Sequence, residues 1–563
     1  MIKYLDFKEA KCKDCYRCLR ECPVKAIAVI NHQARIIEDK CILCGTCTLV
    51  CPQNAKMVHS AKEDVKKLLS NNKVIASVAP SFVSSLGVDD FNAVRTALQK
   101  LGFYDAEETA AGAKAVAEKY KELLNKREYK NFITSSCPAV NNLIQKYYPK
   151  ALDYLAKVDT PMIAHAKMLK IKYPNAKIVF IGPCIAKKKE AYESAIIDGV
   201  LTYEDLAEML KEQNVKLYKA DVMPANRYEL GNKARNFPIA RGIIKSIDSL
   251  PEGYEYLSVD GLEKCMDILS SIDKIENCFL ELNACEYACI NGPCSLTEKE
   301  YAVVANGEIR KYAKKNSSNG EIGSMDSLLI DTVYYPENII KTVSESEIKA
   351  ILAKTNKFKK EDELNCGACG YSTCREKAAA VALGYADVEM CLPYMREKAE
   401  TMSYEIIHNN PNGIVIVDDD LIVRDINIRA VEMLGIKKKT IKGEPLVDFY
   451  NPTDFVTAMT DKSQVHTQVL LDKTHIIADT TVSYLKEYNV LFGIFTDITE
   501  HVKKDEILNK MRLDTLKTTD AVIEKQMRVA QEIASLLGET TAETKVALVN
   551  LKKAVTETEV DNE

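Results

Sequence analysis

The chain has no tryptophan, and its 47% of hydrophobic residues never form an apolar run as long as the ~18 residues that a membrane helix needs. The opening residues, MIKYLDFKEA, lack the apolar core of a signal peptide. A formal net charge of −5 gives no reason to expect binding to nucleic acid or to anionic membranes. We therefore expect a cytoplasmic protein with neither nucleic-acid nor membrane partners.

Cysteine, by contrast, is abundant, with 19 in 563 residues. Without an export signal, so many cysteines argue against disulfides and for metal ligands. A chain of this length is expected to form roughly three to five domains of about 150 residues. The cysteines fall into separate groups along the chain, so each group is considered by its own spacing.

Two copies of one cysteine motif lie within the first 60 residues. Each reads C-x2-C-x2-C-x3-C-P, the spacing of bacterial ferredoxins with two 4Fe–4S clusters, in which the fourth cysteine binds the other cluster. The sequence therefore predicts one cluster on Cys12, Cys15, Cys18 and Cys51, and a second on Cys41, Cys44, Cys47 and Cys22. The alternative is a pair of four-cysteine zinc sites, although zinc does not need this tandem spacing.

A different motif, C-x2-C-x4-C-x16-C, is formed by Cys366, Cys369, Cys374 and Cys391. The alanine-rich residues 376–385 predict a helix that returns the fourth thiolate to the other three. This segment resembles the small 4Fe–4S domain of corrinoid and electron-transfer proteins, and the resemblance implies a third cluster. A zinc ion is the alternative here, because a lone four-cysteine site is less diagnostic than a tandem.

Four further cysteines follow predicted buried strands. One strand is expected to end near Ser135, a second before the Gly-Pro that precedes Cys184, and a third before Cys285. Parallel sheets carry ligand sites at the carboxyl ends of their strands, so these loops are expected to bring together Cys137, Cys184, Cys285 and Cys289. The last two are four residues apart, which predicts that both lie on one face of a helical turn.

The segments TSSCP, GPCIAKKKE and ELNACEYACINGP together resemble the three active-site loops of iron-only (FeFe) hydrogenases, and the similarity covers about residues 1–300. The resemblance implies a 4Fe–4S cluster on Cys137, Cys184, Cys285 and Cys289, with Cys289 also bridging to a two-iron subcluster that carries CO, cyanide and azadithiolate. Further residues match the family's pocket by position: Lys187 the lysine that hydrogen-bonds a cyanide, Ala79 and Pro80 the apolar wall, and Glu190 an acidic proton-relay residue.

The sequence departs from this family where protons are moved. Ser136 stands where fast members of the family have a cysteine. A thiol exchanges protons readily near its pKa of about 8.5, whereas a serine hydroxyl resists ionisation. Gly182 and Asn283 stand where the family usually has methionine. We therefore predict that the metal frame is kept and that turnover is slow.

The C-terminal third has another pattern. Residues 401–502 alternate predicted strands and helices and resemble a PAS domain, with no cysteine for a cysteinyl-flavin. Beyond it, one seven-residue grid holds Leu508, Val522, Val529 and Leu536, and the adjacent grid holds Leu516, Ile523, Ala530 and Leu537. Two adjoining stripes predict a helix with a broad apolar seam, suited to homodimerisation, to a partner helix, or to packing on its own PAS domain.

The sequence thus predicts a multidomain α/β and α+β chain. Its expected parts are a two-cluster ferredoxin-like domain (1–60), an active-site domain with parallel sheets (61–345), a small 4Fe–4S domain (346–400), a PAS domain (401–502) and a helical tail (503–563). The favoured function is a sensory FeFe hydrogenase. It would slowly and reversibly oxidise dihydrogen to protons and electrons, exchange electrons with ferredoxin or another carrier, and signal to an unidentified downstream protein.

Two alternatives remain open. One is a ferredoxin-linked metabolic hydrogenase with a regulatory tail, which the altered proton residues argue against. The other is a non-catalytic iron–sulfur protein for electron transfer or scaffolding. Lys187 and Pro80 argue against that reading, because neither residue is needed to hold a cubane cluster.

Overall fold

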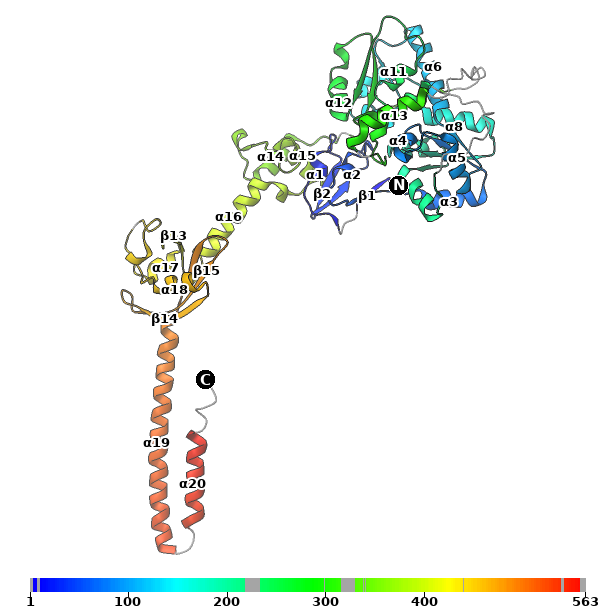
Figure 1. Ribbon diagram of the computed structural model, residues 1–563. Coiled ribbons are helices and arrows are strands. Elements are labelled where there is room, and N and C mark those ends of the chain that lie inside the picture. Colours follow the sequence, from blue (N-terminus) through cyan, green and yellow to red (C-terminus); the bar gives the residue numbers. More distant parts are fainter. Residues whose placement is uncertain are drawn as a thin grey trace. The chain divides into compact units, whose positions relative to one another are not determined.

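The computed structural model describes residues 4–7, 11–217, 233–297, 299–314, 330–337, 339, 341–438, 440–537 and 541–556. The chain divides into two compact units, Met1–Met395 and Arg396–Glu563 (Figure 1). The first unit contains parallel sheets and the second an antiparallel sheet, so the predicted mixture of α/β and α+β folds is confirmed. Within the described ranges, no helix has the length and apolar character needed to cross a membrane.

Residues near the N-terminus form two antiparallel strand pairs, β1 (Leu5–Phe7) with β4 (Lys56–Val58) and β2 (Ile27–Ile30) with β3 (Gln33–Ile36). Two short helices, α1 (Arg17–Arg20) and α2 (Thr46–Leu49), each contain the third cysteine of a motif. Gly45 enters α2 with a φ of +78°, and a Cβ atom there would lie 2.4 Å from the Pro293 side chain. Only glycine lets the second cysteine motif approach the loop at Pro293 so closely.

A four-stranded parallel sheet is formed by strands between Val74 and Leu201. Its strand order is β6 (Asp105–Glu108), β5 (Val74–Val78), β8 (Lys177–Ile181) and β9 (Gly199–Leu201). Every residue of β5 is buried. One face packs against α3 (Lys62–Asn71), α5 (Phe91–Lys100), α10 (Tyr203–Glu212) and α13 (Ala302–Lys314), and the other against α8 (Pro161–Lys172). Helices on both faces explain why the strands read as continuous apolar runs.

A second parallel sheet has the order β10 (Glu255–Asp260), β11 (Cys278–Asn283) and β7 (Phe132–Ile133). It packs between α7 (Pro138–Tyr147) with α12 (Leu262–Ser270) and, on the other face, α6 (Ala110–Lys126) with α11 (Gly242–Ser246). β7 ends at Ile133, earlier than expected. The reason is that the Ser135 N–H donates to the Tyr120 hydroxyl instead of to a neighbouring strand.

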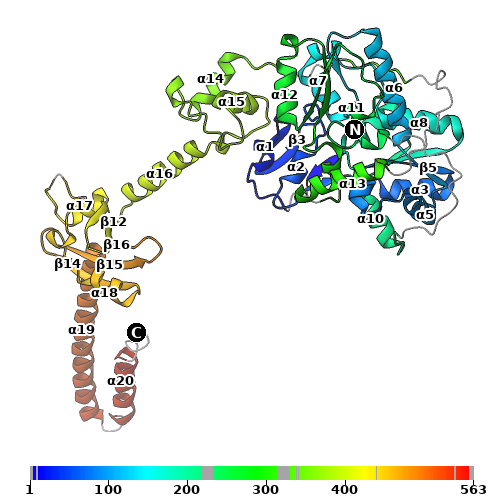
Figure 2. The same cartoon turned by 45° about the horizontal axis from the view of Figure 1, so that its top comes forward.

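The small cysteine-rich segment contains α14 (Glu345–Ala353), α15 (Cys374–Ala382) and the start of α16 (Leu392–His408). The predicted alanine-rich helix is confirmed, although α15 begins and ends slightly earlier than residues 376–385. The segment lies beside the N-terminal strand pairs (Figure 2). The Val29 N–H donates to the Tyr385 carbonyl at 2.9 Å, and the Asn31 N–H to Asp387 Oδ2 at 2.9 Å.

The second unit contains a five-stranded antiparallel sheet. Its order is β13 (Val423–Ile426), β12 (Gly413–Asp418), β16 (Val490–Asp497), β15 (Ile476–Leu485) and β14 (Val465–Leu471). The helices α17 (Ile428–Met433) and α18 (Thr453–Asp461) pack with it around one apolar core. Strands and helices occur along these residues as the sequence pattern predicts, and α18 is an addition that the pattern did not reveal.

The C-terminal helices form an antiparallel pair, α19 (Thr499–Leu537) and α20 (Thr541–Thr556), with Lys552 of α20 3.6 Å from Asp520 of α19. The two predicted stripes differ in exposure. The first is open to solvent, with Leu508, Val522 and Val529 exposed by 54%, 53% and 43%. The second, formed by Leu516, Ile523 and Ala530, is half-buried. The side chains of Leu536 and Leu537 lie outside the described residues.

Candidate functional site

Three loops at the carboxyl ends of parallel strands carry the four cysteines expected to converge. β7 precedes Cys137, β8 precedes Cys184 and β11 precedes Cys285. Cys137 caps the N-terminus of α7, whose first residue is Pro138, as the sequence predicts. Behind Cys184, α9 (Ala186–Ser194) begins two residues later. The loops therefore come from both parallel sheets.

Electrostatic coupling shows that these four thiols are neighbours. Burial, and after it the charge of Cys137, raise the pKa of Cys184 to about 11. Burial likewise raises the pKa of Cys285, with added effects of Cys184, Cys137 and Cys289. Cys137, Cys184 and Cys285 are half-buried and Cys289 is exposed. Coordination to a metal is what removes the protons of thiols with raised pKa values.

One local expectation for this site is wrong. Cys285 and Cys289 do not share a helical turn, because Tyr287 and Ala288 between them have φ angles of +60° and +59°. Two successive left-handed residues break any right-handed helix. Only a short 3-10 turn, Ala288–Asn291, carries Cys289. The chain therefore turns between the two cysteines. Their spacing of four residues does not place them on one face of a helix.

Lys187 lies beside the cysteines and is 8% exposed. Its Nζ donates to Glu190 Oε2 at 2.8 Å and to Thr160 Oγ1 at 2.9 Å. Its positive charge acts to lower the pKa of both Cys184 and Cys289. A buried ammonium group therefore lies next to two of the thiols, and the Glu190 carboxylate accepts a hydrogen bond from it.

Ala79 and Pro80 directly follow β5, beside the end of the neighbouring strand β8. The Ala79 N–H donates to the Ile181 carbonyl at 2.9 Å, and its carbonyl accepts from the Tyr203 hydroxyl at 2.8 Å. A Cβ atom at Gly182 would lie 2.8 Å from two ring carbons of Phe180 and 3.2 Å from the Ala79 Cβ. The Phe180 ring thus occupies space that a side chain at position 182 would need.

Ser136 joins a small network of hydroxyl groups. Its Oγ lies 3.1 Å from the Tyr120 hydroxyl, which is also 2.9 Å from Ser135 Oγ. Tyr120 is fully buried in α6, and burial raises the pKa of its hydroxyl. The cysteine loops gave no sign of Tyr120. The only available signal was a lone tyrosine three residues after the alanine-rich residues 110–117.

Asn283 also has a polar partner. Its Nδ2 donates to Asp260 Oδ1 at 3.1 Å, and burial raises the pKa of Asp260. The charge of Asp260 in turn contributes to the raised pKa of Cys289. An amide–carboxyl pair therefore stands near Cys289, at a position where the hydrogenase resemblance leads one to expect methionine. Sequence reasoning did not identify Asp260.

The N-terminal cysteines divide between two neighbourhoods. One pocket is lined by Cys22, Cys41, Cys44 and Cys47, together with apolar residues. Its Cys44 raises the pKa of Cys285, and the pKa of Cys44 is raised mainly by burial with a contribution from Cys137. This pocket therefore adjoins the active-site cysteines. Of the remaining set, Cys12 and Cys15 both contribute to the raised pKa of Cys18, while Cys51 Sγ accepts from the Ala55 N–H at 3.4 Å.

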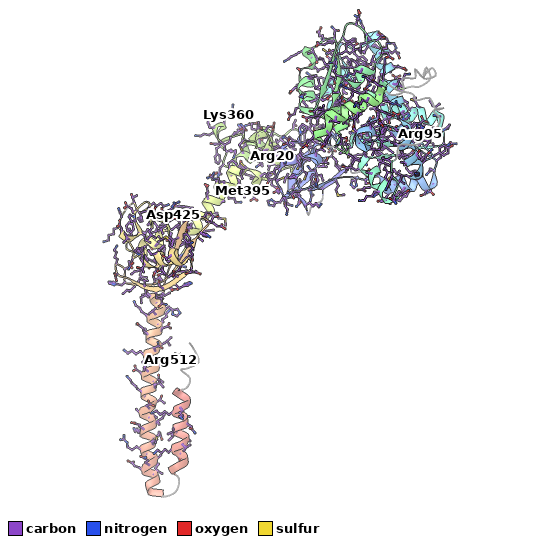
Figure 3. All side chains as sticks on the ribbon, in the orientation of Figure 1. Arg20, Arg95, Lys360, Met395, Asp425 and Arg512 are labelled. Atoms are coloured by element: carbon purple, nitrogen blue, oxygen red, sulfur yellow. The ribbon has the colours of Figure 1, made fainter. Side chains whose placement is uncertain are left out.

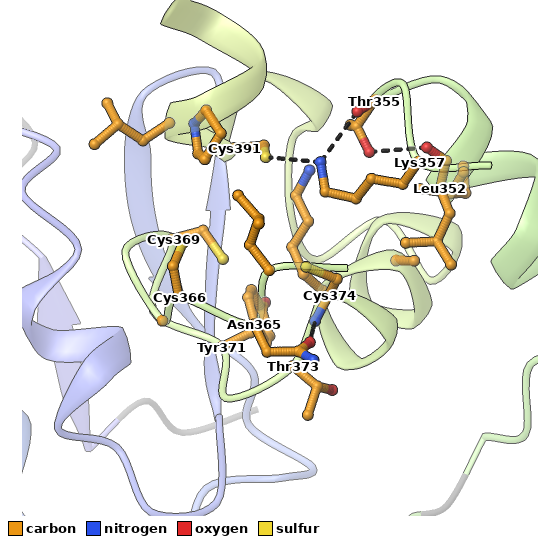
Figure 4. A pocket seen from close by; sticks show the side chains of 17 residues that line it. Leu352, Thr355, Lys357, Asn365, Cys366, Cys369, Tyr371, Thr373, Cys374 and Cys391 are labelled. Atoms are coloured by element: carbon orange, nitrogen blue, oxygen red, sulfur yellow. Dashed lines mark hydrogen bonds between the residues drawn. The ribbon is translucent and has the colours of Figure 1, made fainter. Parts of the chain in front are cut away.

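The four later cysteines line a single pocket, shown in Figure 4, and they are Cys366, Cys369, Cys374 and Cys391. Lys357 reaches into the same pocket, where its Nζ lies 3.5 Å from Cys391 Sγ. Tyr371 links this pocket to the N-terminal one, because burial first and then the charges of Cys369 and Cys22 raise its pKa. The pocket of the small segment therefore lies next to the N-terminal pocket that contains Cys22.

No three or more His, Cys, Asp or Glu side chains are placed to hold one metal ion anywhere in the described ranges. A zinc site needs four ligands that converge tightly on a point. A 4Fe–4S cluster needs a wider arrangement, because each thiolate binds a different iron atom.

Comparison with protein families assigns most of the chain. Residues 72–293 match the C-terminal domain of the iron-only hydrogenase large subunit. Residues 34–57 match a 4Fe–4S binding domain, residues 362–393 an Fe–S cluster family, and residues 401–498 the PAS fold. The cysteines of all three active-site loops lie within the hydrogenase match.

Individual relatives agree with these matches. A subunit of an NADP-reducing hydrogenase from Solidesulfovibrio fructosivorans is 26% identical over 36% of this chain and 43% of its own length. The periplasmic Fe hydrogenase large subunit of Nitratidesulfovibrio vulgaris is 31% identical over 39% of this chain and 60% of its own length. The chain therefore spans about half the length of these curated relatives.

Solved structures with similar folds include an FeFe hydrogenase from Chlamydomonas reinhardtii, which is 15% identical. The similarity covers 50% of this chain and 100% of that one, with a TM-score of 0.40. A PAS domain from Vibrio parahaemolyticus is 17% identical and covers 17% of this chain and 98% of its own, with a TM-score of 0.15. By these family matches, residues 72–293 are similar to the C-terminal domain of the iron-only hydrogenase large subunit, and the flanking segments are similar to iron–sulfur cluster domains and to the PAS fold.

Proposed function

We propose that the chain is an FeFe hydrogenase that oxidises dihydrogen slowly and reversibly, and that it reports to a partner protein through its PAS domain and C-terminal helices. The observation that carries the proposal is the group of four coupled thiols with Lys187 buried beside them. A cubane cluster requires only the thiolates. A buried ammonium group against them is an additional part, and it fits a cofactor with anionic ligands.

The residues present suit the six-iron cofactor of this family. Cys137, Cys184, Cys285 and Cys289 would hold it, and when bound it supplies the interconversion of dihydrogen with two protons and two electrons. Lys187 would supply positive charge and an N–H donor to a cyanide ligand, because charge-assisted hydrogen bonds are the stronger ones. Ala79 and Pro80 would keep water from that pocket.

Proton transfer is where this chain is expected to be slow. The side chain before Cys137 is a hydroxyl, and it meets the hydroxyl of Tyr120 at 3.1 Å. Both groups pass protons poorly near neutral pH, because neither ionises readily. The acidic candidate Glu190 is held in an ion pair with Lys187. These features support slow turnover rather than fast metabolic production or consumption of dihydrogen.

Electrons would leave the active site through the neighbouring cysteine sets. The set with Cys44 adjoins the active-site thiols, and Tyr371 lies between Cys22 and Cys369 of the small segment. We therefore propose three 4Fe–4S clusters in addition to the active-site cluster, and ferredoxin or another carrier as the external electron partner. The exposed stripe of α19 supports a further contact with a second copy of the chain or with a signalling protein.

The deciding experiment is infrared spectroscopy of the full chain, reconstituted with iron–sulfur clusters and the synthetic two-iron cofactor, under argon and then under dihydrogen. We expect CO and cyanide bands that shift reversibly with the gas. Lys187→Met is the informative variant, because it removes the ammonium group and leaves all four thiols. It is expected to shift the cyanide bands or weaken cofactor retention.

The same sample distinguishes the alternatives. Absence of bound bands in the wild type would leave a non-catalytic electron-transfer or scaffold protein. Gas-responsive bands with turnover as fast as that of metabolic hydrogenases would favour the ferredoxin-linked metabolic enzyme. Gas-responsive bands with turnover at least tenfold slower support the sensory reading, at a difference of about 1.4 kcal/mol in activation free energy.

A further inference from the structure

Two buried lysines face the cysteine pocket of the small segment. Lys357 is 9% exposed, and its Nζ donates to the Thr355 carbonyl at 3.0 Å and points at Cys391 Sγ, 3.5 Å away (Figure 4). Lys377, on α15, is 5% exposed, and its Nζ donates to the Val388 carbonyl at 2.8 Å. Both line the pocket formed by the four cysteines.

The acidic groups nearby are engaged elsewhere. Glu376 accepts a hydrogen bond from the Ser372 N–H at 3.1 Å, and Glu363 pairs with Arg375 at 3.1 Å. Both lysines donate to backbone carbonyls, and Lys357 also meets the Cys391 thiol, which carries no countercharge while it is protonated. At the ferredoxin-type cysteines, Lys146 pairs with Glu337 at 3.3 Å, and the buried Lys56, 9% exposed, donates to the Cys47 carbonyl at 3.0 Å. The small segment therefore has a surplus of buried positive charge at its cysteines.

We propose that Lys357 and Lys377 raise the reduction potential of the cluster held by Cys366, Cys369, Cys374 and Cys391, so that this cluster accepts an electron more readily than it would without them. The inference rests on the proposed presence of that cluster. Reduction adds one negative charge, and buried cations stabilise that charge far more than exposed ones do. One reduced ferredoxin-type cluster loses one electron, the small-segment cluster gains it, and no bond is made or broken.

Cys391 connects the cluster site to the helix that follows it. Its carbonyl accepts the Met395 N–H at 2.9 Å, so the last cysteine is the N-terminal cap of α16. The unpaired amides at a helix N-terminus also favour a negative charge. α16 continues from Leu392 to His408, and strand β12 begins at Gly413. Reduction of the cluster would therefore place a negative charge at the N-cap of α16, the helix that leads into the PAS sequence.

The test is a potentiometric titration of the full chain, followed by electron paramagnetic resonance. A Cys366→Ser variant identifies the signal of the small-segment cluster. We expect Lys357→Met and Lys377→Met each to weaken its reduction equilibrium about tenfold, which equals about 59 mV for one electron. Lys357→Arg, which keeps the charge, is expected to retain most of the potential. The matched control is Lys360→Met, because Lys360 is exposed (labelled in Figure 3) and is expected to leave the potential unchanged.

The outcomes separate this inference from the cluster assignment. Equal potentials in both buried-lysine variants and the Lys360 control would overturn the inference while the cluster remains. A Cys366→Ser chain with unchanged iron content and unchanged signals would show that the site holds no cluster, and the assignment itself would fail. Two independent lysine variants keep the test decisive if one of them does not fold.

Discussion

Two of the four-cysteine sites within the first unit are built in opposite ways. Cys366 to Cys391 lie in one short segment around α15, and one pocket gathers all four. Cys137 to Cys289 come from loops on two different sheets and meet only because those sheets pack together. A local site tolerates changes elsewhere in the chain. A long-range site depends on the packing of every element that carries a ligand.

The lysines beside the two sites also differ, in the groups to which they donate hydrogen bonds. The lysine at the long-range site, Lys187, is paired with a carboxylate, Glu190. The lysines at the local site, Lys357 and Lys377, donate to backbone carbonyls. An ion pair with an ionisable partner suits proton handling, whereas uncompensated positive charge suits holding an electron. In the proposed function, the chemistry therefore belongs to the first site and electron storage to the second.

The largest effect is expected from removing one thiol at each site. Cys184→Ser should abolish the gas-responsive infrared bands completely, because the active-site cluster loses a ligand from a distant loop. Cys366→Ser should lower the iron content and leave those bands in place. Iron analysis and infrared spectra of both variants check this. Loss of the bands in both variants would mean that the sites are not independent.

A smaller effect is expected from restoring the missing thiol. Ser136→Cys should raise turnover about tenfold or more, because general acid–base groups contribute ~10²–10⁴-fold when their pKa suits the task. The assay is dihydrogen oxidation with an artificial electron acceptor. Ser70→Cys adds a thiol at an exposed helix position and should change nothing. A wild type already as fast as metabolic enzymes, with no gain from Ser136→Cys, would refute the prediction of slow turnover.

The dependence of the long-range site on packing is testable at Gly112. A Cβ atom there would lie 2.4 Å from the Pro161 carbonyl oxygen and 2.6 Å from the His165 nitrogen, both backbone atoms of α8. Gly112→Ala should destabilise the active-site domain by about 1–3 kcal/mol, as overpacking does. Gly307→Ala in α13, where nothing lies within 4 Å, should instead stabilise by about 0.5–1 kcal/mol. Urea unfolding of both variants measures the contrast.

The smallest effect concerns a buried carboxyl in β11. Burial raises the pKa of Glu281 from 4.5 to about 7. Because the folded state holds this proton more tightly, its contribution to stability is present below pH 4.5 and is lost as the pH rises through 7. Glu281→Gln cannot ionise, so its urea midpoint should fall less than that of the wild type between pH 5 and pH 8. An equal fall in both proteins would show that Glu281 does not titrate in this range.

The sequence by itself determined the elements whose signals are local. Apolar runs identified the strands before Cys137, Cys184 and Cys285, proline marked the start of α7, and cysteine spacing identified the small segment. These features depend on residues that are close together in the chain, so a pattern can reveal them. Even so, local spacing misled at Cys285 and Cys289, because the left-handed conformations of Tyr287 and Ala288 leave no periodic trace.

Only the tertiary structure decided the contacts between distant segments. It brought the Tyr120 hydroxyl to Ser136, the Phe180 ring over Gly182, and the Lys357 ammonium to Cys391. It also divided the two apolar stripes of α19, leaving one exposed and one half-buried beside α20. Each outcome depends on which surfaces pack together. Packing is a property of the assembled elements, so no window of sequence contains it.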